Sequence, residues 1–382
     1  MMRFCWFILV VCCLLIGTVA HAFSALVDVG ADPGSAYNAH STSMGYRQLN
    51  QSVIGGEGSW GYLTCDSDAR RLYIARETRV QVVDLQQGKV VGEVANTPGV
   101  QGIALVPKLH HGFTSNGKDN SVTVFNMKDL TEVQRITVGT GPEAIVFDPE
   151  TRRVFTMNAG SHDITAIDTA KAKVVGTLPL GGRPASAVVD EQGLLFVTIA
   201  DTNEIVAIDA AKLTILHRWT LAAGEHPTGL AIDPRHHRLF SVCSNAKMIV
   251  LDSNDGRVVE TLPIGNGAET AVFDPQTGFV FSSNGRDGTM TVIHEDAPDT
   301  LNVTDTVTTQ PGARTMALDM KSHRLYLATA RFTTPTTGSG QPPTMEPNSF
   351  MILAFGTPPS PHQQDSHGRG GRGGMGRRRG GF

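Results

Sequence analysis

The fold is decided by one stretch of sequence, Pro142-Glu-Ala-Ile-Val-Phe-Asp148-Pro-Glu-Thr-Arg-Arg-Val-Phe155-Thr-Met-Asn158. It returns as Pro227-Thr-Gly-Leu-Ala-Ile-Asp233-Pro-Arg-His-His-Arg-Leu-Phe240 and as Ala268-Glu-Thr-Ala-Val-Phe-Asp274-Pro-Gln-Thr-Gly-Phe-Val-Phe281-Ser-Ser-Asn284. Weaker copies begin at Trp60, Val100, Pro184 and Ala313. The first apolar run of each copy ends at Asp66, Val106, Asp148, Asp190, Asp233, Asp274 and Asp319, so the steps are 40, 42, 42, 43, 41 and 45 residues. The chain therefore holds seven copies of one repeat.

Each copy holds four short β-runs, which in the third copy span residues 143–147, 154–158, 163–167 and 174–178. Asp148-Pro149 between the first two runs suits a type I turn, because proline presets φ and the carboxylate accepts a backbone N–H. Helical repeats would need an apolar period of 3.6 residues, which is absent, and a β-helix would need shorter rungs. The pattern predicts an all-β fold, a seven-bladed β-propeller of four-stranded blades over residues 47–356.

The two ends of the array predict how the ring closes. The seventh copy has β-runs at residues 314–318, 324–328 and 350–355 and lacks a fourth. Residues 48–56, ahead of the first copy, repeat the fourth-strand pattern of residues 174–182, including its final Gly-Gly. We expect this N-terminal strand to complete the last blade, which closes the ring and removes its open edge.

The second run of several copies carries an aromatic-x-x-Asn signature. It reads Phe113-Thr-Ser-Asn116, Phe155-Thr-Met-Asn158 and Phe281-Ser-Ser-Asn284, and an Ile-Asp strand end follows at Ile167-Asp168 and Ile208-Asp209. These residues resemble the YVTN-repeat, YncE-like β-propeller family. Blades one and seven depart from the signature, with Tyr73-Ile-Ala-Arg76 and Tyr326-Leu-Ala-Thr329. The resemblance implies a WD40-like propeller that acts as a binding or scaffold protein.

Residues 1–22 read as a secretory signal peptide. Arg3 supplies the positive start, residues 4–16 are almost all apolar, and Ala20-His21-Ala22 is a small-x-small cleavage site. We expect cleavage after Ala22, a linker over residues 23–46, and a periplasmic or extracellular protein without a transmembrane span.

Residues 357–382 form a tail rich in Pro, Gly and Arg, including Gly368-Arg369-Gly370-Gly371-Arg372. It lacks apolar residues to bury and is predicted to be disordered. Arg-Gly tracts can bind nucleic acid or another polyanion. Residues 23–359, however, carry 26 Lys and Arg against 35 Asp and Glu, a net charge of -9. Such an acidic body argues against nucleic acid as the partner.

The positions of the cysteines predict no disulfide bond. Three of the five cysteines lie in the leader, and Cys65 and Cys243 fall on different repeats. We expect both to be free thiols and the protein to be a monomer.

The loops that join consecutive blades converge on the axis of a propeller and line the mouth of its channel. They present Trp60, Gln101, Glu143, Arg183, His226, Glu269 and Arg314. Such a ring can hold a small polar ligand or a protein partner by charge-assisted hydrogen bonds, and it can equally be an ordinary wet channel. Nearby loops between second and third strands carry Asn116, Asn158, Asn245 and Asn284, read as turn residues that tolerate positive φ. The long loop of residues 331–348 is expected near this mouth.

Motifs for metals and cofactors are absent. His110-His111 and His236-His237 lie in first-to-second strand turns on the opposite face, and adjacent histidines on a turn rarely converge on one ion. The repeated aspartates are read as turn formers. We therefore expect no metal, no cofactor and no catalytic residue.

The leading prediction is an exported scaffold that binds a ligand or a protein through its channel mouth. One alternative is a hydrolase similar to lactonase propellers, which needs His226, Arg183 and Glu143 to converge. The other is a polyanion binder that uses the tail.

Overall fold

The computed structural model describes residues 45–333 and 344–358. The signal peptide, the linker up to residue 44, the centre of the 331–348 loop and the tail from residue 359 lie outside the described residues. Within the described ranges, no helix is long and apolar enough to cross a membrane.

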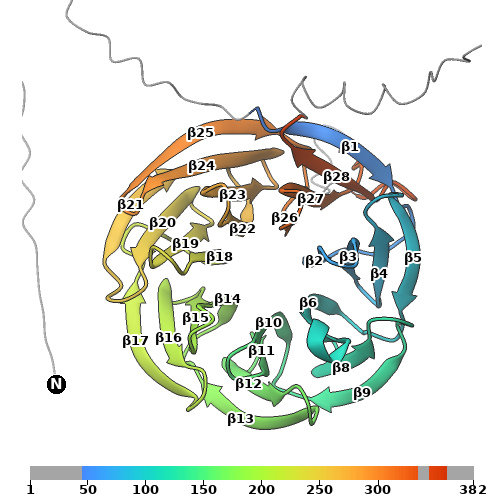
Figure 1. The fold of residues 1–382 in the computed structure, drawn as a ribbon, viewed down its shortest axis with the longest axis horizontal. Coiled ribbons are helices and arrows are strands. Elements are labelled where there is room, and N and C mark those ends of the chain that lie inside the picture. The colour runs from blue at the N-terminus through green and yellow to red at the C-terminus, as the bar shows by residue number, and fades with distance from the viewer. Residues whose placement is uncertain (1–44, 334–343, 359–382) are drawn as a thin grey trace, which may run out of the picture. The chain divides into compact units, whose positions relative to one another are not determined.

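Seven four-stranded antiparallel sheets surround a central channel (Figure 1). Blade one holds β2 (Leu63–Asp66), β3 (Arg71–Arg76), β4 (Arg79–Asp84) and β5 (Lys89–Val94). Blade two holds β6 (Val100–Val106), a 3-10 turn (Pro107–Leu109), β7 (His111–Asn116), β8 (Ser121–Asn126) and β9 (Glu132–Thr137). Blade three holds β10 (Pro142–Asp148), β11 (Arg153–Asn158), β12 (Asp163–Asp168) and β13 (Lys173–Pro179). Each predicted run of the third copy agrees with its strand to within one residue at either end.

The remaining blades follow the same order. Blade four holds β14 (Pro184–Val189), β15 (Leu194–Ile199), β16 (Glu204–Asp209) and β17 (Thr214–Thr220). Blade five holds β18 (Pro227–Asp233), β19 (Arg238–Cys243), β20 (Lys247–Asp252) and β21 (Val258–Pro263). Blade six holds β22 (Ala268–Asp274), β23 (Phe279–Asn284), β24 (Thr289–Ala297) and β25 (Thr300–Thr308). Its last two strands have nine residues each and are the longest in the ring.

Blade seven joins the two ends of the described chain. It consists of β26 (Thr315–Asp319), β27 (Arg324–Thr329), β28 (Met351–Gly356) and β1 (Arg47–Val53), with β1 outermost. β1 pairs antiparallel with β28, for example Gln51 with Leu353. The predicted closure by the N-terminal strand is confirmed, and Figure 1 shows β1 at the rim beside β28.

The hydrophobic core lies between the blades, and one buried aromatic side chain recurs in every blade. The third residue of every second strand is aromatic and at least 95% buried: Tyr73, Phe113, Phe155, Phe196, Phe240, Phe281 and Tyr326. Each inter-blade cluster unites neighbouring sheets; Phe155 and Met157 of blade three, for instance, pack with Leu195 and Val197 of blade four. Burying one such ring contributes roughly 2–3 kcal/mol, so the repeat spreads stability evenly around the ring.

The repeated aspartates form turns as predicted. Asp148 Oδ1 accepts the N–H of Glu150 at 3.2 Å, and Asp274 Oδ1 accepts that of Gln276 at 3.1 Å. Cys65 and Cys243 are free thiols, also as predicted.

The signature asparagines have a different role from the predicted one. Asn116, Asn158 and Asn284 are fully buried and do not have positive φ, so their interpretation as turn residues was wrong. Asn116 Nδ2 donates to Ser121 Oγ at 3.0 Å and Thr123 Oγ1 at 2.9 Å on the next strand. A buried amide needs such partners, so each signature asparagine ties the second strand of its blade to the third.

Candidate functional site

Local irregularities at the start of the inner strands set the side chains of the channel mouth. In blades two to six the register with the second strand shifts within the first few residues of the inner strand. Gln101, Glu143 and Glu269 each lie inside such a shift. A bulge re-aims side chains that regular pleating would alternate between faces. The bulges therefore decide which residues reach the opening.

Hydrogen bonds from the neighbouring blade fix the backbone at these positions. The N–H of Tyr62 donates to the Gln101 carbonyl at 2.7 Å. The hydroxyls of Ser115 and Ser283 donate to the carbonyls of Glu143 and Arg314. Because each mouth residue is tied to the blade beside it, the opening is held in one geometry before any ligand arrives.

Three ion pairs surround the mouth and are here called the mouth pairs. Arg183 Nη2 lies 2.8 Å from Glu143 Oε1, Arg314 Nε lies 3.0 Å from Glu269 Oε2, and Lys118 Nζ lies 3.0 Å from Glu77 Oε1. Each joins two neighbouring blades. All six side chains are between 35% and 63% exposed, so water and solutes reach them.

The groups nearest the axis have altered acidity. Burial against the channel wall raises the pKa of Glu269 and the charge of Glu143 adds to this, whereas Arg314 opposes it. Burial also raises the pKa of Tyr62, again reinforced by both glutamates. Glu143 and Glu269 both contribute to the raised pKa of Tyr62, and Glu143 contributes to that of Glu269. The three side chains therefore interact electrostatically near the axis.

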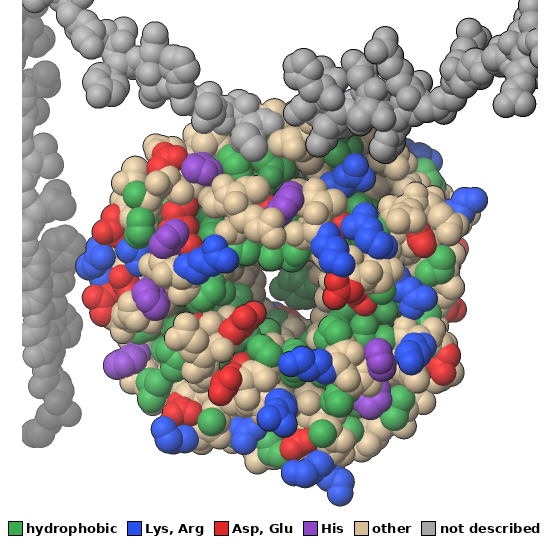
Figure 2. All heavy atoms as spheres, in the orientation of Figure 1, with side chains coloured by type: hydrophobic (Ala, Val, Ile, Leu, Met, Phe, Trp, Pro, Cys, Tyr) green, Lys and Arg blue, Asp and Glu red, His purple; other side chains and the backbone are tan. Residues whose placement is uncertain are grey.

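A cavity of about 310 Å³ opens between blades seven, one, two and three. Gln101, Glu143, Lys118, Glu77 and Arg314 line it together with glycine backbone from the blade-joining loops. Small-molecule sites begin at about this size. Figure 2 views the ring from the face opposite the mouth and shows the channel opening at its centre, with acidic and basic side chains around it.

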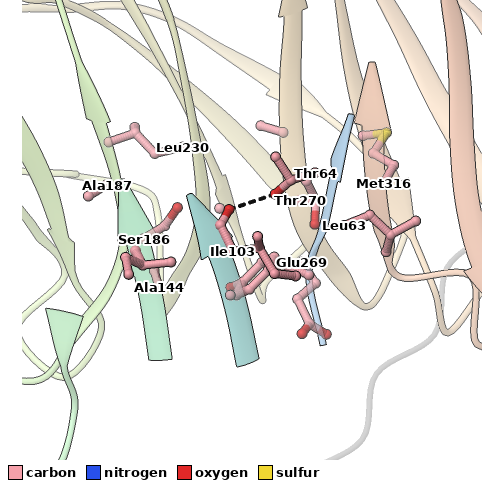
Figure 3. A pocket seen from close by; sticks show the side chains of 15 residues that line it. Leu63, Thr64, Ile103, Ala144, Ser186, Ala187, Leu230, Glu269, Thr270 and Met316 are labelled. Carbon is pink, nitrogen blue, oxygen red and sulfur yellow. Dashed lines mark hydrogen bonds between the residues drawn. The ribbon is translucent and has the colours of Figure 1, made fainter. Parts of the chain in front are cut away.

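The middle of the channel is narrower. A cavity of about 160 Å³ is lined by inner-strand residues of all seven blades, most of them small or apolar, such as Ala144, Ala187 and Ala271. Figure 3 shows the inner strands around this space and the hydrogen bond from Thr64 to the Ile103 carbonyl, 2.7 Å long. This section has room for a few waters and is smaller than the pockets that hold drug-sized ligands.

The far end of the channel widens again to about 550 Å³. Its wall is largely apolar and includes Ile145, Phe147 and Cys65. Burial first, and then the charge of Asp319, raises the pKa of the Cys65 thiol to about 12. The thiol is therefore protonated at neutral pH and is a poor nucleophile.

The seven predicted mouth residues take different positions in the structure. Gln101, Glu143 and Arg314 line the mouth cavity, and Glu269 lies just inside the channel in contact with Arg314. Arg183 is exposed and reaches the mouth through Glu143. Trp60 also lines the mouth cavity but is 94% buried: its ring packs 5.4 Å from the Phe350 ring, and its carbonyl accepts from Arg314 at 2.9 Å.

His226 does not occupy the position of Glu143 in its blade. It has a φ of 45° and its N–H donates to Asn203 Oδ1, as Gly141, with a φ of 61°, donates to Asn120 Oδ1 in blade three. Its Nδ1 lies 3.1 Å from the Ala200 carbonyl. The structure brings Arg183 and Glu143 together, while the His226 ring is held by this carbonyl.

Sequence reasoning missed Tyr62 and Glu77. Glu77 follows a strand that lacks the signature asparagine and has a φ of 49°, a conformation that glutamate rarely adopts. Tyr62 precedes an inner strand of only four residues. The other mouth residues were placed by aligning the repeats, and blade one departs from the repeat at this point. That departure was the only signal in the sequence that blade one would contribute different residues to the mouth.

Residues 94–260, from the end of blade one through blade five, match the family model described as YNCE-like beta-propeller. Over this stretch the chain is YncE-like. The resemblance carried by the asparagine signature is confirmed, and the YncE-like stretch continues in the structure into a ring of seven blades.

Solved structures share the architecture of this chain. A chain of Kuenenia stuttgartiensis hydrazine synthase is 18% identical with a TM-score of 0.63, over 72% of this chain and 94% of that one. U3-55K is 10% identical with a TM-score of 0.67, over 81% and 98%. The RRP9 WD40 repeats are 10% identical with a TM-score of 0.67, over 82% and 98%. At these identities the likeness shows the fold alone. No protein of curated function matches the sequence.

Proposed function

We propose that this protein is an exported propeller whose channel mouth binds a small, uncharged, hydroxyl-rich molecule such as a sugar. The observation that carries the proposal is the mouth cavity of about 310 Å³, bordered by paired charges that remain open to solvent. Export is proposed from residues 1–22 of the sequence.

Charge balance favours a neutral ligand. The mouth pairs contain three cations and three carboxylates, so an ion of either sign gains little net Coulomb energy there. A carboxylate or phosphate would have to displace Glu143 from Arg183. A hydroxyl, in contrast, accepts from an arginine N–H and donates to a carboxylate at once, and each such bond to a charged group contributes about 1.5–3 kcal/mol.

The same geometry weakens the two alternatives. A lactonase-like reaction needs a histidine beside Arg183 and Glu143, and the His226 ring is engaged by the Ala200 carbonyl. A polyanion needs an excess of positive charge, which the mouth pairs do not offer, so a polyanion binder would depend on the tail of residues 357–382 alone.

Calorimetric titration of the full-length protein tests this proposal. The probes are neutral mono- and oligosaccharides, citrate and a single-stranded oligonucleotide. We expect heat of binding from at least one saccharide, and at least tenfold weaker binding after Gln101→Ala and Glu143→Gln together. Lys171 and Lys212, exposed at turns on the other face, provide the matched control pair for alanine substitution. Binding of citrate or the oligonucleotide in preference to every saccharide would refute the neutral-ligand proposal.

A further inference from the structure

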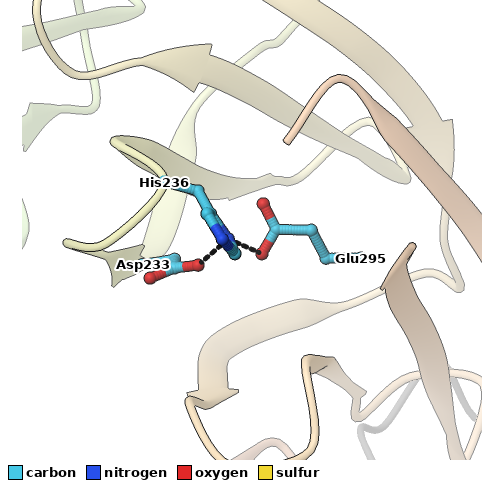
Figure 4. A group of neighbouring side chains, drawn as sticks. All are labelled: Asp233, His236 and Glu295. Carbon is cyan, nitrogen blue, oxygen red and sulfur yellow. Dashed lines mark ion pairs between the residues drawn. The ribbon is translucent and has the colours of Figure 1, made fainter. Parts of the chain in front are cut away.

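A second group of polar side chains lies on the face opposite the mouth, where blades five and six meet. Asp233 ends β18, His236 lies in the turn that follows, and Glu295 comes from β24 of the next blade. His236 Nδ1 is 2.7 Å from Asp233 Oδ2 and 3.5 Å from Glu295 Oε2. Figure 4 shows the three side chains pointing toward one another, with donor atoms that all lie within 4.8 Å.

Two carboxylates are buried here, and one oxygen of Glu295 lacks a partner in the described part of the chain. Asp233 is 99% buried and Glu295 is 92% buried. Among the described residues, Glu295 Oε1 has no hydrogen-bond partner. Two buried carboxylates this close are stabilised by a shared proton or by a compensating cation, and the half-exposed His236 supplies at most one positive charge.

Other blade junctions show what an ordinary structural pair looks like at the same position. The turn aspartate Asp274 faces His323 Nδ1 at 2.7 Å, and Asp319 faces Arg70. In each of these junctions one carboxylate meets one basic group. The junction between blades five and six adds a second buried carboxylate, so its composition differs from that of a simple ion pair.

The added carboxylate comes with an added piece of structure. β24 and β25 are longer than the other strands, and their hairpin extends over the blade-five turn. Arg238, 95% buried, holds this hairpin: its Nη2 lies 2.7 Å from Asp299 and its Nη1 lies 2.9 Å from Asp252. The position of Glu295 relative to Asp233 is therefore fixed by a buried clamp beside the group.

We propose that Asp233, His236 and Glu295 bind a divalent transition-metal cation of the Zn²⁺ class. One imidazole nitrogen and two carboxylates are suitable ligands for such an ion. Donors about 2.1 Å from a tetrahedral centre lie about 3.4 Å apart, close to the 3.5 Å between His236 and Glu295. The exposed imidazole needs only a small rotation to open the 2.7 Å contact with Asp233. Because the imidazole is exposed, the fourth coordination position of the ion would face solvent and be open to water or a ligand.

Calorimetric titration of the full-length, untagged protein with Zn²⁺ tests this site. We expect one equivalent to bind with release of protons, seen as a dependence of the heat on the buffer. Glu295→Gln and His236→Gln should each weaken that equivalent at least tenfold. Two histidine variants serve as controls and should leave it unchanged: His237→Asn next to the site, and His323→Asn in the single-carboxylate pair.

Melting curves without metal accompany each variant. His236 lies in an exposed turn, so His236→Gln keeps the test usable if Glu295→Gln does not fold. Equal Zn²⁺ uptake by the wild type and His236→Gln would overturn the site. So would an equal loss in His237→Asn and His236→Gln, which would assign the ion to the surface histidine pair.

Discussion

The two openings of the channel are formed by opposite ends of the same seven inner strands, yet they use charge differently. At the mouth, the side chains of Arg183 and Glu143 are 50% and 35% exposed. At the other end, the carboxylates of Asp274 and Asp319 are fully buried beneath a histidine and an arginine of the next blade. Both ends pair charges across neighbouring blades, but one end buries its carboxylates while the other leaves them accessible to solvent.

The pKa shifts of the carboxyl groups also differ between the two ends of the channel. Burial opposes ionisation of Asp319, but hydrogen bonds from Ser322, Ser67 and Arg70 outweigh it and lower its pKa. A lowered carboxyl pKa stabilises the fold above the unfolded value of about 3.9, and this stability is lost as pH falls. Glu269 at the mouth has a raised pKa, so its contribution has the opposite sign.

Opening the ring has the largest expected effect, because both ends depend on seven closed blades. Deletion of residues 23–56 removes β1 and Tyr46, whose ring packs 5.0 Å from Phe281. We expect the melting temperature, followed by circular dichroism, to fall by more than about 10 °C. Deletion of residues 359–382 is the control and should leave it unchanged. An unaltered melting curve after the first deletion would disprove the contribution of closure.

Asp319→Ala tests whether the buried end carries stability. The change leaves Arg70 without its carboxylate and removes the acceptor for Ser322. We expect the free energy of unfolding in urea to fall by about 2–4 kcal/mol at pH 7, with a smaller loss at pH 3. Asp68→Ala is the matched control, since Asp68 is 83% exposed and pairs with Lys321 nearby. Similar losses in the two variants would remove the distinction between buried and exposed carboxylates.

Arg183→Ala with Arg314→Ala tests the mouth. The side chains of both arginines are about half exposed in their ion pairs, so the free energy of unfolding should change by less than about 1 kcal/mol. Binding of any saccharide identified by calorimetry should nevertheless weaken at least tenfold, because both arginine donors are lost. Retained affinity would place the ligand outside the mouth pairs.

Glu269→Gln has the smallest expected effect. It tests whether Glu269 and Asp319 make the stability depend on pH in opposite directions. Its raised pKa means that the wild-type carboxyl stabilises the fold more as pH falls through the folded value toward the unfolded one, about 4.3. The wild type should therefore gain stability relative to the variant between pH 7 and pH 4, by less than about 1 kcal/mol. Urea denaturation at both pH values measures this. A relative loss toward pH 4 would contradict the sign.

The fold was predictable because its information is periodic. Each turn aspartate and each buried aromatic recurs at a nearly constant step, and seven weak signals add to one strong one. The role of Asn158 was not predictable in the same way. Its side chain bonds across to Thr165, and strand pairing at that level depends on register rather than on residue type.

The candidate sites were predictable only in part. In the structure Gln101 and Glu143 line the mouth cavity, whereas His226 lies one residue before its inner strand, at the repeat position of Gly141 and not of Glu143. The group around Glu295 left one trace in the sequence, the 45-residue step from Asp274 to Asp319. That extra length is the long β24–β25 hairpin, and only folding brings it next to His236 of another repeat.

The closing strand also makes the completion of the last blade depend on both ends of the propeller sequence. β1 is synthesised first, and its partner β28 follows roughly 300 residues later. A product that stops before Met351 leaves β1 without a partner and blade seven with an open edge, which proteases and aggregation exploit. Only a chain translated through its last strand can bury that edge, so the topology separates finished molecules from truncated ones.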